Sequence, residues 1–424
     1  MIPALILFAI TYVLMLVFSK YRPYIALASA LIFIVSGMLP LGNVIGEIDF
    51  NVLLMIAGTM GLVALFIESK MPSLLADLIM EKVPNVMWAA VSMSLFAGVI
   101  SAFVDNVATV LMIAPVALAI CKKLDTNPVP FIIGVAVSSN LQGAATLVGD
   151  TTAIMLGSAL DMSFMDFFWF KGRPSIFFAV ELGAVLSALI LAFIFRKEKK
   201  PIPKTAERTK VTDYVPTILL CGAIVLLILV SFIENKPDVT NGLICFALMI
   251  VGIIYNFIKK KNVSAIIEPL KGIDFETLGL LLGLFLMIGG IKEQGVIDAA
   301  ANLLVDLGGG NLFLMYTVIV WASVIISAFI DNIPYVATMI PVIAGIAAAM
   351  NVDPTVLYFG LLSGATLGGN CTPIGASANI TGIGILRREG YEVKNSDFFK
   401  IGIPFTLAAI IPAYIYIWLL YGGM

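Results

Sequence analysis

The sequence predicts an all-α polytopic membrane protein with two inverted repeats, about ten membrane-crossing segments and two re-entrant helical hairpins. Three observations support this fold class: the composition, the apolar segments and an internal duplication. Hydrophobic residues make up 60% of the 424 residues and charged residues 12%, whereas about 25% of a soluble domain is charged. This composition excludes a soluble globular protein, a disordered chain and a nucleic-acid binder. The chain has no histidine, which excludes histidine metal sites and Ser–His triads.

Ten apolar segments are long enough to cross a membrane, which takes about 20 mostly apolar residues. They are residues 2–18, 24–41, 51–67, 129–157, 174–195, 214–233, 238–258, 275–291, 355–385 and 402–421. Two further apolar stretches, 87–121 and 312–350, are too long for one helix, and an Asp-Asn pair interrupts each near its middle. We predict that these two stretches are re-entrant hairpins, which enter and leave the membrane on the same side.

The basic residues indicate the orientation. With these segments, 21 of the 25 lysines and arginines lie on one side of the membrane, among them Lys20 and Arg22 in the first loop. Loops on the cytoplasmic side of membrane proteins are enriched in Lys and Arg. The split predicts a protein of the cytoplasmic membrane with both termini outside the cytoplasm and a charged cytoplasmic linker at 196–213.

The chain contains an internal repeat. Residues 100–149 and 326–375 align without a gap and share 16 identical positions. The shared landmarks include Asp105 with Asp331, Asn106 with Asn332, Thr146 with Thr372 and Gly149 with Gly375. Five crossings separate the span that starts at 51 from the span that starts at 275, so the two halves have opposite orientations. Inverted repeats with broken helices are typical of secondary transporters.

The Asp-Asn pairs are candidate ion-binding groups. Asp105 and Asp331 each lie within long uncharged stretches, and a carboxylate there costs several kcal/mol unless it is solvated by protein, neutralised or paired. At a hairpin tip, half-helices leave backbone groups without helical partners, and hard cations prefer such oxygens together with a carboxylate. We therefore predict a Na⁺ site from Asp105, Asn106, Asp150, Asp331 and Asn332. The alternative is that both aspartates only cap the helices that follow them.

The segments 129–157 and 355–385 are too long and too rich in glycine and small polar residues to be plain helices. Pro373 cannot sit unperturbed in a helix, and glycine lowers helix stability. We predict that both are unwound at mid-membrane, where freed carbonyls can bind cations and new helix N-termini can face anions. The alternative is that the small residues permit close helix packing.

The motifs Ser101-Ala102-Phe103-Val104-Asp105-Asn106, Asp331-Asn332-Ile333-Pro334 and Gly368 to Asn379 resemble those of the ion transporter superfamily. The nearest resemblance is to ArsB-type arsenite permeases, NhaD-type sodium–proton antiporters and the melanosomal P protein, with citrate and dicarboxylate permeases more distant. One departure is that Gly149-Asp150 is followed here by Thr151-Thr152-Ala153, where relatives often continue Gly-Asp-Pro-Pro-Asn.

The resemblance implies an elevator-type carrier, usually a homodimer. Residues 1–83 and 214–306 would form a scaffold. Residues 84–195 and 307–424 would form the two halves of the transport domain. Carried over by position, one half-site comprises Asp105, Asn106, Asn140, Thr146, Gly149 and Asp150. The other comprises Asp331, Asn332, Asn370, Thr372, Gly375, Ser377 and Asn379.

These observations predict a secondary-active ion carrier rather than an enzyme, with Na⁺ or H⁺ as coupling ion, no other cofactor, and a small inorganic ion or anion as substrate. Within the same fold, the alternatives are an arsenite exporter, for which Cys371 offers a thiol, and a citrate or dicarboxylate permease. An intramembrane aspartyl protease would require Gly-x-Gly-Asp, whereas this chain has Leu147-Val148-Gly149-Asp150. A passive ion channel is the remaining alternative.

Overall fold

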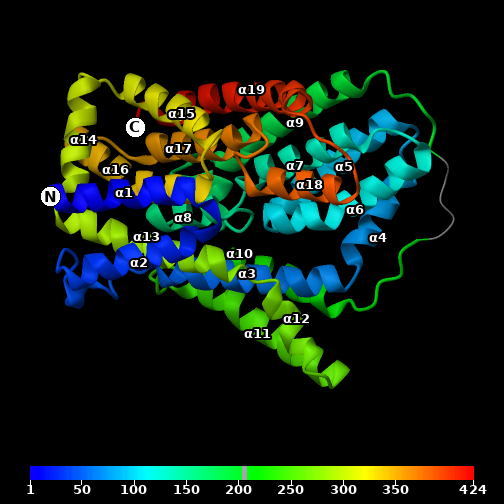
Figure 1. Ribbon diagram of the computed structural model, residues 1–424, viewed down its shortest axis with the longest axis horizontal. Helices are drawn as coiled ribbons and strands as arrows, with labels where there is room; N and C mark the ends of the chain where they lie inside the picture. Colours follow the sequence, from blue (N-terminus) through cyan, green and yellow to red (C-terminus); the bar gives the residue numbers. More distant parts are fainter. Residues whose placement is uncertain (203–207) are drawn as a thin grey trace.

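The computed structural model describes residues 1–202 and 208–424, so residues 203–207 of the predicted linker lie outside the described residues. The regular secondary structure of the described residues is α-helical, with four short 3₁₀ helices and one small hairpin, β1 (Trp169–Phe170) with β2 (Arg173–Pro174) (Figure 1). The helices of the first half are α1 (Ile2–Val17), α2 (Arg22–Val35), α3 (Phe50–Glu68), α4 (Met71–Met80), α5 (Val86–Ser101), α6 (Asn106–Leu124), α7 (Pro128–Gly143), α8 (Thr151–Ala159) and α9 (Ile176–Phe195). Those of the second half are α10 (Val215–Val230), α11 (Thr240–Lys260), α12 (Ser264–Lys271), α13 (Phe275–Glu293), α14 (Val296–Leu307), α15 (Leu312–Ser327), α16 (Asn332–Met350), α17 (Thr355–Gly368), α18 (Ser377–Arg388) and α19 (Asn395–Tyr421).

Seven of the described helices are long and apolar enough to cross a membrane: α3, α6, α9, α11, α13, α16 and α19. The number is eight if α1 and α2, which meet at a bend of 116°, form one span. Helices also lie at the other predicted segments, but breaks divide 129–157 and 355–385 into pieces of 9 to 16 residues. The segment 214–233 holds a single helix of 16 residues. The ten crossings therefore remain a prediction.

Each predicted interruption is a break between two helices. The chain leaves helical geometry just before Asp105 and Asp331, and the side chain of each aspartate accepts hydrogen bonds from backbone N–H groups of the next helix. The two longer breaks separate α7 from α8 and α17 from α18. The capping role that the sequence left open is thus observed at both tips.

Helices from the two halves of the chain pack in pairs across the molecule. Helix α3 packs against α11, and α2 packs against α13. A side chain at Gly58 would lie 2.4 Å from the backbone of Cys245, and one at Gly283 would lie 2.7 Å from that of Ala26. Glycine therefore permits both close crossings.

A second group of helices surrounds the breaks. Helix α5 packs on α7, α15 on α17, and α9 on α19, while α18 packs on α6 and α7. In Figure 1, α5, α6, α7 and α18 lie on the right, and α1 and α2 extend from the left end to about the middle. The N and C labels both lie on the left.

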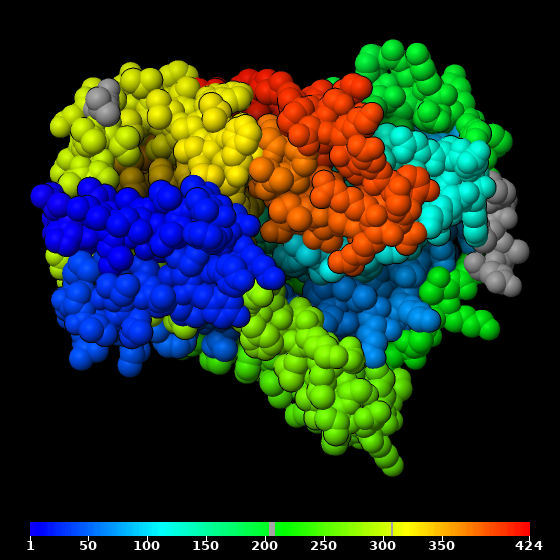
Figure 2. Space-filling model, viewed as in Figure 1, coloured from blue at the N-terminus to red at the C-terminus, as the bar shows by residue number. Residues whose placement is uncertain are grey.

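Three short helices were not predicted. Helices α4, α12 and α14 have 10, 8 and 12 residues, which is too short for the length criterion of a crossing. Helix α4 contacts α3, α5 and α6, and α14 contacts α13 and α16. These two helices therefore link the group around α3 and α13 to the group around the breaks. The corner between α11 and α12 projects from the lower edge of the molecule (Figure 2).

Candidate functional site

A cavity of about 200 Å³ lies where two segments face α3 and the start of α13. These segments are the turn between α5 and α6, called the first tip, and the break between α7 and α8, called the first long break. Its lining comprises Met60, Val63, Ala64, Ile67, Asp105, Asn106, Val107, Ala108, Leu111, Asp150, Thr151, Gly272, Asp274, Thr277, Asn332, Ile333 and Ser377. Three of these residues are aspartates, and none of these lining residues is a lysine or an arginine. Five predicted site residues thus meet in one cavity: Asp105, Asn106, Asp150, Asn332 and Ser377.

Asp105 lies at the tip between α5 and α6. One of its oxygens, Oδ2, accepts hydrogen bonds from the backbone N–H groups of Val107 at 2.9 Å and Ala108 at 3.1 Å. Among the described residues, no lysine or arginine pairs with Asp105. A small void continues from Asp105 to Gly149 and Asp150 at the start of α8. The carboxylate is therefore held by its helix while it faces the cavity.

Asp150 is the N-cap of α8. Its Oδ2 accepts a hydrogen bond from the Thr152 hydroxyl at 2.9 Å, and its Oδ1 accepts one from the Thr152 backbone N–H at 3.4 Å. The Thr152 hydroxyl also lies 3.1 Å from the hydroxyl of Thr366 on α17. Asp150 is thus buried, with hydroxyl and amide partners, next to the second half of the chain.

Buried asparagines join the two halves beneath the cavity. Asn106 Nδ2 donates to Asn140 Oδ1 at 3.0 Å. Asn140 Nδ2 donates to the Thr366 carbonyl at 2.7 Å and to Asn370 Oδ1 at 3.1 Å. Asn370 in turn donates to the Val137 carbonyl at 2.9 Å. Because Asn140 and Asn370 are completely buried, these bonds fix the first tip relative to both long breaks.

The two long breaks are fastened to the tips in the same way. The Thr146 hydroxyl donates to the Ala102 carbonyl, and the Thr372 hydroxyl donates to the Ala328 carbonyl. Each hydroxyl also accepts a backbone N–H two residues later at 3.3 Å. These threonines and their neighbouring glycines position the breaks and do not line the main cavity.

Glycine is required where break and tip meet. A Cβ at Gly149 would lie 2.5, 2.6 and 2.8 Å from the carbonyl oxygens of Gly143, Ser101 and Ala102. A Cβ at Gly375 would lie 2.6 to 2.8 Å from those of Gly369, Ala328 and Ser327. Only a residue without a side chain permits this approach.

The second tip, the turn between α15 and α16, contributes Asn332 to the lining of the cavity, while Asp331 lies outside that lining. Asp331 Oδ2 accepts a hydrogen bond from Arg22 Nη1 at 3.2 Å, and its Oδ1 accepts the Ile333 backbone N–H at 3.2 Å. Arg22, which the sequence predicts in the first loop, is the first residue of α2 and pairs with the carboxylate at the second tip.

The remaining predicted residues of the second half are structural neighbours of the site. Asn379 Nδ2 donates to the carbonyls of Gly369 and Thr372 at 3.0 Å, which holds the break between α17 and α18. Cys371 is half-buried and lies outside the lining of the cavity. The thiol therefore gives no support to an arsenite site there.

Asp274 and Thr277, which line the cavity from α13, were not predicted. Asp274 Oδ1 accepts the Thr277 backbone N–H at 3.0 Å, and Oδ2 accepts the Thr277 hydroxyl at 2.7 Å. The signal was present, because Ile48-Asp49-Phe50 and Ile273-Asp274-Phe275 match within the repeat. What the sequence could not indicate is that the start of α13 faces the tip at Asp105.

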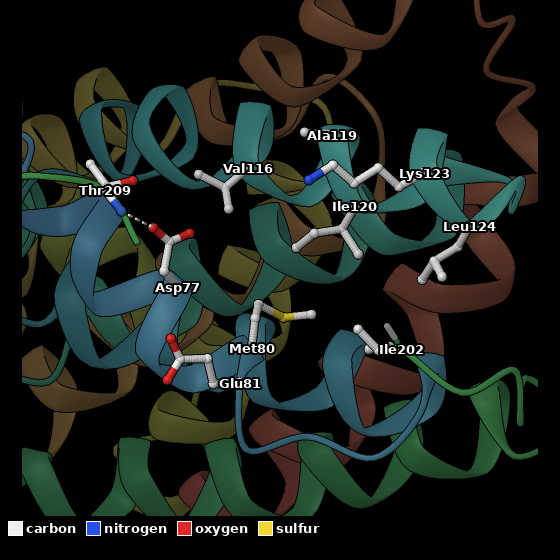
Figure 3. Close-up of a pocket in the computed structure, with 10 residues that line it drawn as sticks. All are labelled: Asp77, Met80, Glu81, Val116, Ala119, Ile120, Lys123, Leu124, Ile202 and Thr209. Carbon is white, nitrogen blue, oxygen red and sulfur yellow. Dashed lines mark hydrogen bonds between the residues drawn. The ribbon is translucent and has the colours of Figure 1, made fainter. Parts of the chain in front are cut away.

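Two other cavities are lined by carboxylates together with a basic side chain. The cavity in Figure 3, of about 190 Å³, lies between α4 and α6. There Asp77 accepts the Thr209 backbone N–H at 2.8 Å, and two hydrogen bonds from Arg208 lower the pKa of Glu81.

A larger cavity, of about 510 Å³, lies near the start of α3. In it, Lys292 lies 3.5 Å from Glu47, and the Ser158 hydroxyl donates to Asp49. The cavity at Asp105 and Asp150 differs from both because no basic side chain neutralises it.

This arrangement suits a hard cation or a proton. In the part of the chain that the structure describes, no three Cys, Asp or Glu side chains form a metal-binding group. Carboxylate, amide and hydroxyl oxygens together are what an alkali cation requires, and a buried carboxylate can alternatively take up a proton.

Replacing Asn140 with alanine is expected to destabilise the protein by about 3 kcal/mol, because it leaves buried partners on both halves without hydrogen bonds. Thermal unfolding of the purified protein in detergent measures this. Ser138→Ala is the matched control, since Ser138 is buried on the same helix and makes no side-chain hydrogen bond to the described residues. Equal unfolding temperatures for both variants would contradict the role of Asn140.

Comparisons with known proteins agree with this architecture. A family model described as "Citrate transporter" (CitMHS) matches residues 5–364 and, in a second match, residues 248–423. A 46 kDa membrane protein of Mycobacterium leprae is 36% identical over 325 residues, which cover 76% of this chain and 74% of that protein. The human P protein is 28% identical over 449 aligned residues, covering 87% of this chain and 53% of that protein.

Among solved structures, the YdaH transporter of Alcanivorax borkumensis matches with a TM-score of 0.61 and 13% identity, covering 89% of this chain and 87% of that chain. This likeness shows the fold. The family match confirms the resemblance inferred from the Asp-Asn and Gly368–Asn379 motifs. With its breaks, its long apolar helices and this match, the chain belongs to the CitMHS citrate transporter family of the ion transporter superfamily and is a multi-pass membrane transporter.

Proposed function

We propose that this protein is a secondary-active ion carrier in which Na⁺ or H⁺ binds between Asp105 and Asp150 and drives the movement of a small ion. The observation that carries this proposal is the cavity at the first tip, which has three aspartates and no basic residue in its lining. An empty site of this charge is costly inside a membrane. Binding of a cation or proton stabilises it, which is what a coupling site requires.

The proposed transport cycle is of the elevator type. The matching contacts of Thr146 with Ala102 and of Thr372 with Ala328 support two inverted repeats with equivalent tips and breaks. The group around α3, α11, α2 and α13 is the proposed scaffold, and the group around the breaks is the proposed transport domain. The cavity lies between these groups, so a shift of one against the other would change its access. The family resemblance further suggests a homodimer.

The proposed orientation places the linker at 196–213 in the cytoplasm and Met424 outside. The basic residues of the loops support this, and Figure 1 places the C label toward the end opposite the coil that follows α9. Single cysteines at Lys197 and Met424, in a background without the four native cysteines, are expected to react differently with a membrane-impermeant maleimide in intact cells. Position 424 should be labelled and position 197 only after lysis. The reverse pattern would invert the topology.

Flux measurements in proteoliposomes test the proposed function. Purified protein is supplied with a panel of labelled inorganic ions, arsenite, citrate and dicarboxylates under imposed Na⁺ or pH gradients. Saturable accumulation that follows one of the gradients is expected. Flux without saturation or gradient dependence would instead indicate a passive channel and contradict the proposal.

A carboxylate permease is the second candidate, favoured by the description of the matching family model. Because no basic residue lines the cavity, a citrate or dicarboxylate anion would need a bound cation beside Asp105 and Asp150 to offset its charge. The same panel distinguishes the candidates: citrate flux that requires the cation gradient supports a permease, and gradient-driven flux of an inorganic ion alone supports the first proposal.

A further inference from the structure

The turn between α1 and α2 places an arginine beside the second tip. Arg22 Nη1 donates to Asp331 Oδ2 at 3.2 Å, and Arg22 Nε donates to the Met15 carbonyl at 3.3 Å. The two charged side chains are only 24% and 16% exposed. The guanidinium is thus held between the carboxylate and the last turns of α1.

The hairpin of α1 and α2 is docked on the start of α16, which keeps Arg22 in place. The Tyr12 hydroxyl donates to the Pro334 carbonyl at 2.6 Å and also contacts the Thr338 hydroxyl. Thr11 and Ser29 join the two helices of the hairpin through hydroxyl groups 2.7 Å apart. In Figure 2 the hairpin, in dark blue, runs across the left half of the face below the yellow segments and ends near the middle. Arg22 is therefore part of a packed contact with the second tip.

The two half-sites differ in charge although their backbones correspond. The first has two carboxylates, Asp105 and Asp150, and no described lysine or arginine pairs with either. In the second, Ala376 stands at the position of Asp150 in the repeat, and Asp331 is paired with Arg22. When ionised, the first half-site carries two negative charges, whereas Asp331 and Arg22 give the second half-site no net charge.

We infer that Arg22 is the permanent counter-ion of the second half-site, so that the coupling cation binds only at the first. This rests on the proposed function. The Arg22 guanidinium stays positively charged, and because it is part of the chain it cannot dissociate from Asp331 as a bound ion would. A cation that displaced it from Asp331 would leave this largely buried positive charge unpaired, which is strongly unfavourable. Arg22 thereby limits the number of coupling ions that one cycle can carry.

The test measures transient currents on solid-supported membranes after Na⁺ or pH jumps without substrate, for proteoliposomes of wild type, Arg22→Gln, Arg22→Lys and the double variant Arg22→Gln/Asp331→Asn. Wild type is expected to give one saturable component. Arg22→Gln frees Asp331 and should add a second component. The double variant removes that carboxylate and should return to the single component, with the half-saturating concentration of wild type. Arg22→Lys keeps the charge and should behave as wild type.

The outcomes separate this inference from the proposed function. An absence of cation-induced current in wild type would contradict the proposed function itself. A wild-type current that stays unchanged in Arg22→Gln would overturn the inference alone. Should Arg22→Gln not fold, the neutral double variant decides: an unchanged half-saturating concentration supports Arg22 as the counter-ion, and loss of a cation component overturns it.

Discussion

Replacing Asp105 with asparagine is expected to lower the apparent affinity for the coupling cation on the order of 100-fold while the protein still folds. Asparagine retains an oxygen that can accept the backbone N–H groups of Val107 and Ala108, so the helix cap is preserved. The charge is lost, and removing one partner of a buried charge pair typically costs about 2 to 5 kcal/mol. Asp150→Asn is expected to act in the same direction.

Gradient-driven flux at varied Na⁺ concentration and pH measures this effect. Asp274→Asn is the matched control: Asp274 lines the same cavity, but the residue is exposed, whereas Asp150 is buried. Its effect should be no more than about threefold, as expected for an exposed charge. If Asp105→Asn and Asp150→Asn both showed the cation dependence of wild type, these carboxylates would only cap their helices, and the proposed cation site would be contradicted.

Gly149→Ala and Gly375→Ala are expected to destabilise the protein by about 3 kcal/mol each, near the upper end of the usual cost of overpacking. In both cases the new methyl group would meet three backbone carbonyl oxygens within 2.8 Å. These oxygens belong to the tip and to the break itself, so neither can move without disturbing the cavity. Both variants should lose yield and unfold at lower temperature in detergent.

Gly384→Ala on α18 provides the control, because a Cβ at that position has no heavy atom within 4 Å. It should be neutral or slightly stabilising, since alanine favours the helix over glycine. Stability equal to wild type in Gly149→Ala would mean that the break and the tip do not approach each other as described.

The helices and their breaks could be predicted because their causes are local. The runs of apolar residues, the Asp-Asn pairs and Pro373 are each visible in a short window of sequence, and helices and breaks occur at those places. Helices α4 and α14 were missed because 10 and 12 residues fall below the length of a crossing. Whether the hairpins are re-entrant depends on the membrane, so it remains a prediction.

The site could be predicted only in part, because contacts between distant segments leave no local signal. The repeat identified Asp105 and Asn106, and the family resemblance added Asp150; these residues line the cavity together with Asn332 and Ser377. The pairing of Arg22 with Asp331 joins residues 309 positions apart. A basic residue after the first apolar run is expected in a loop, so only the packing of α1 and α2 on α16 reveals its role.

We propose that the coupling cation or proton binds in the cavity of Asp105 and Asp150. The most direct test compares the transient currents that Na⁺ or pH jumps induce in wild type and in Asp105→Asn/Asp150→Asn. A saturable current is expected in wild type for one of the two ions, and no current above the level of protein-free liposomes is expected in the double variant. A current of unchanged amplitude and half-saturation in the double variant would contradict this proposal.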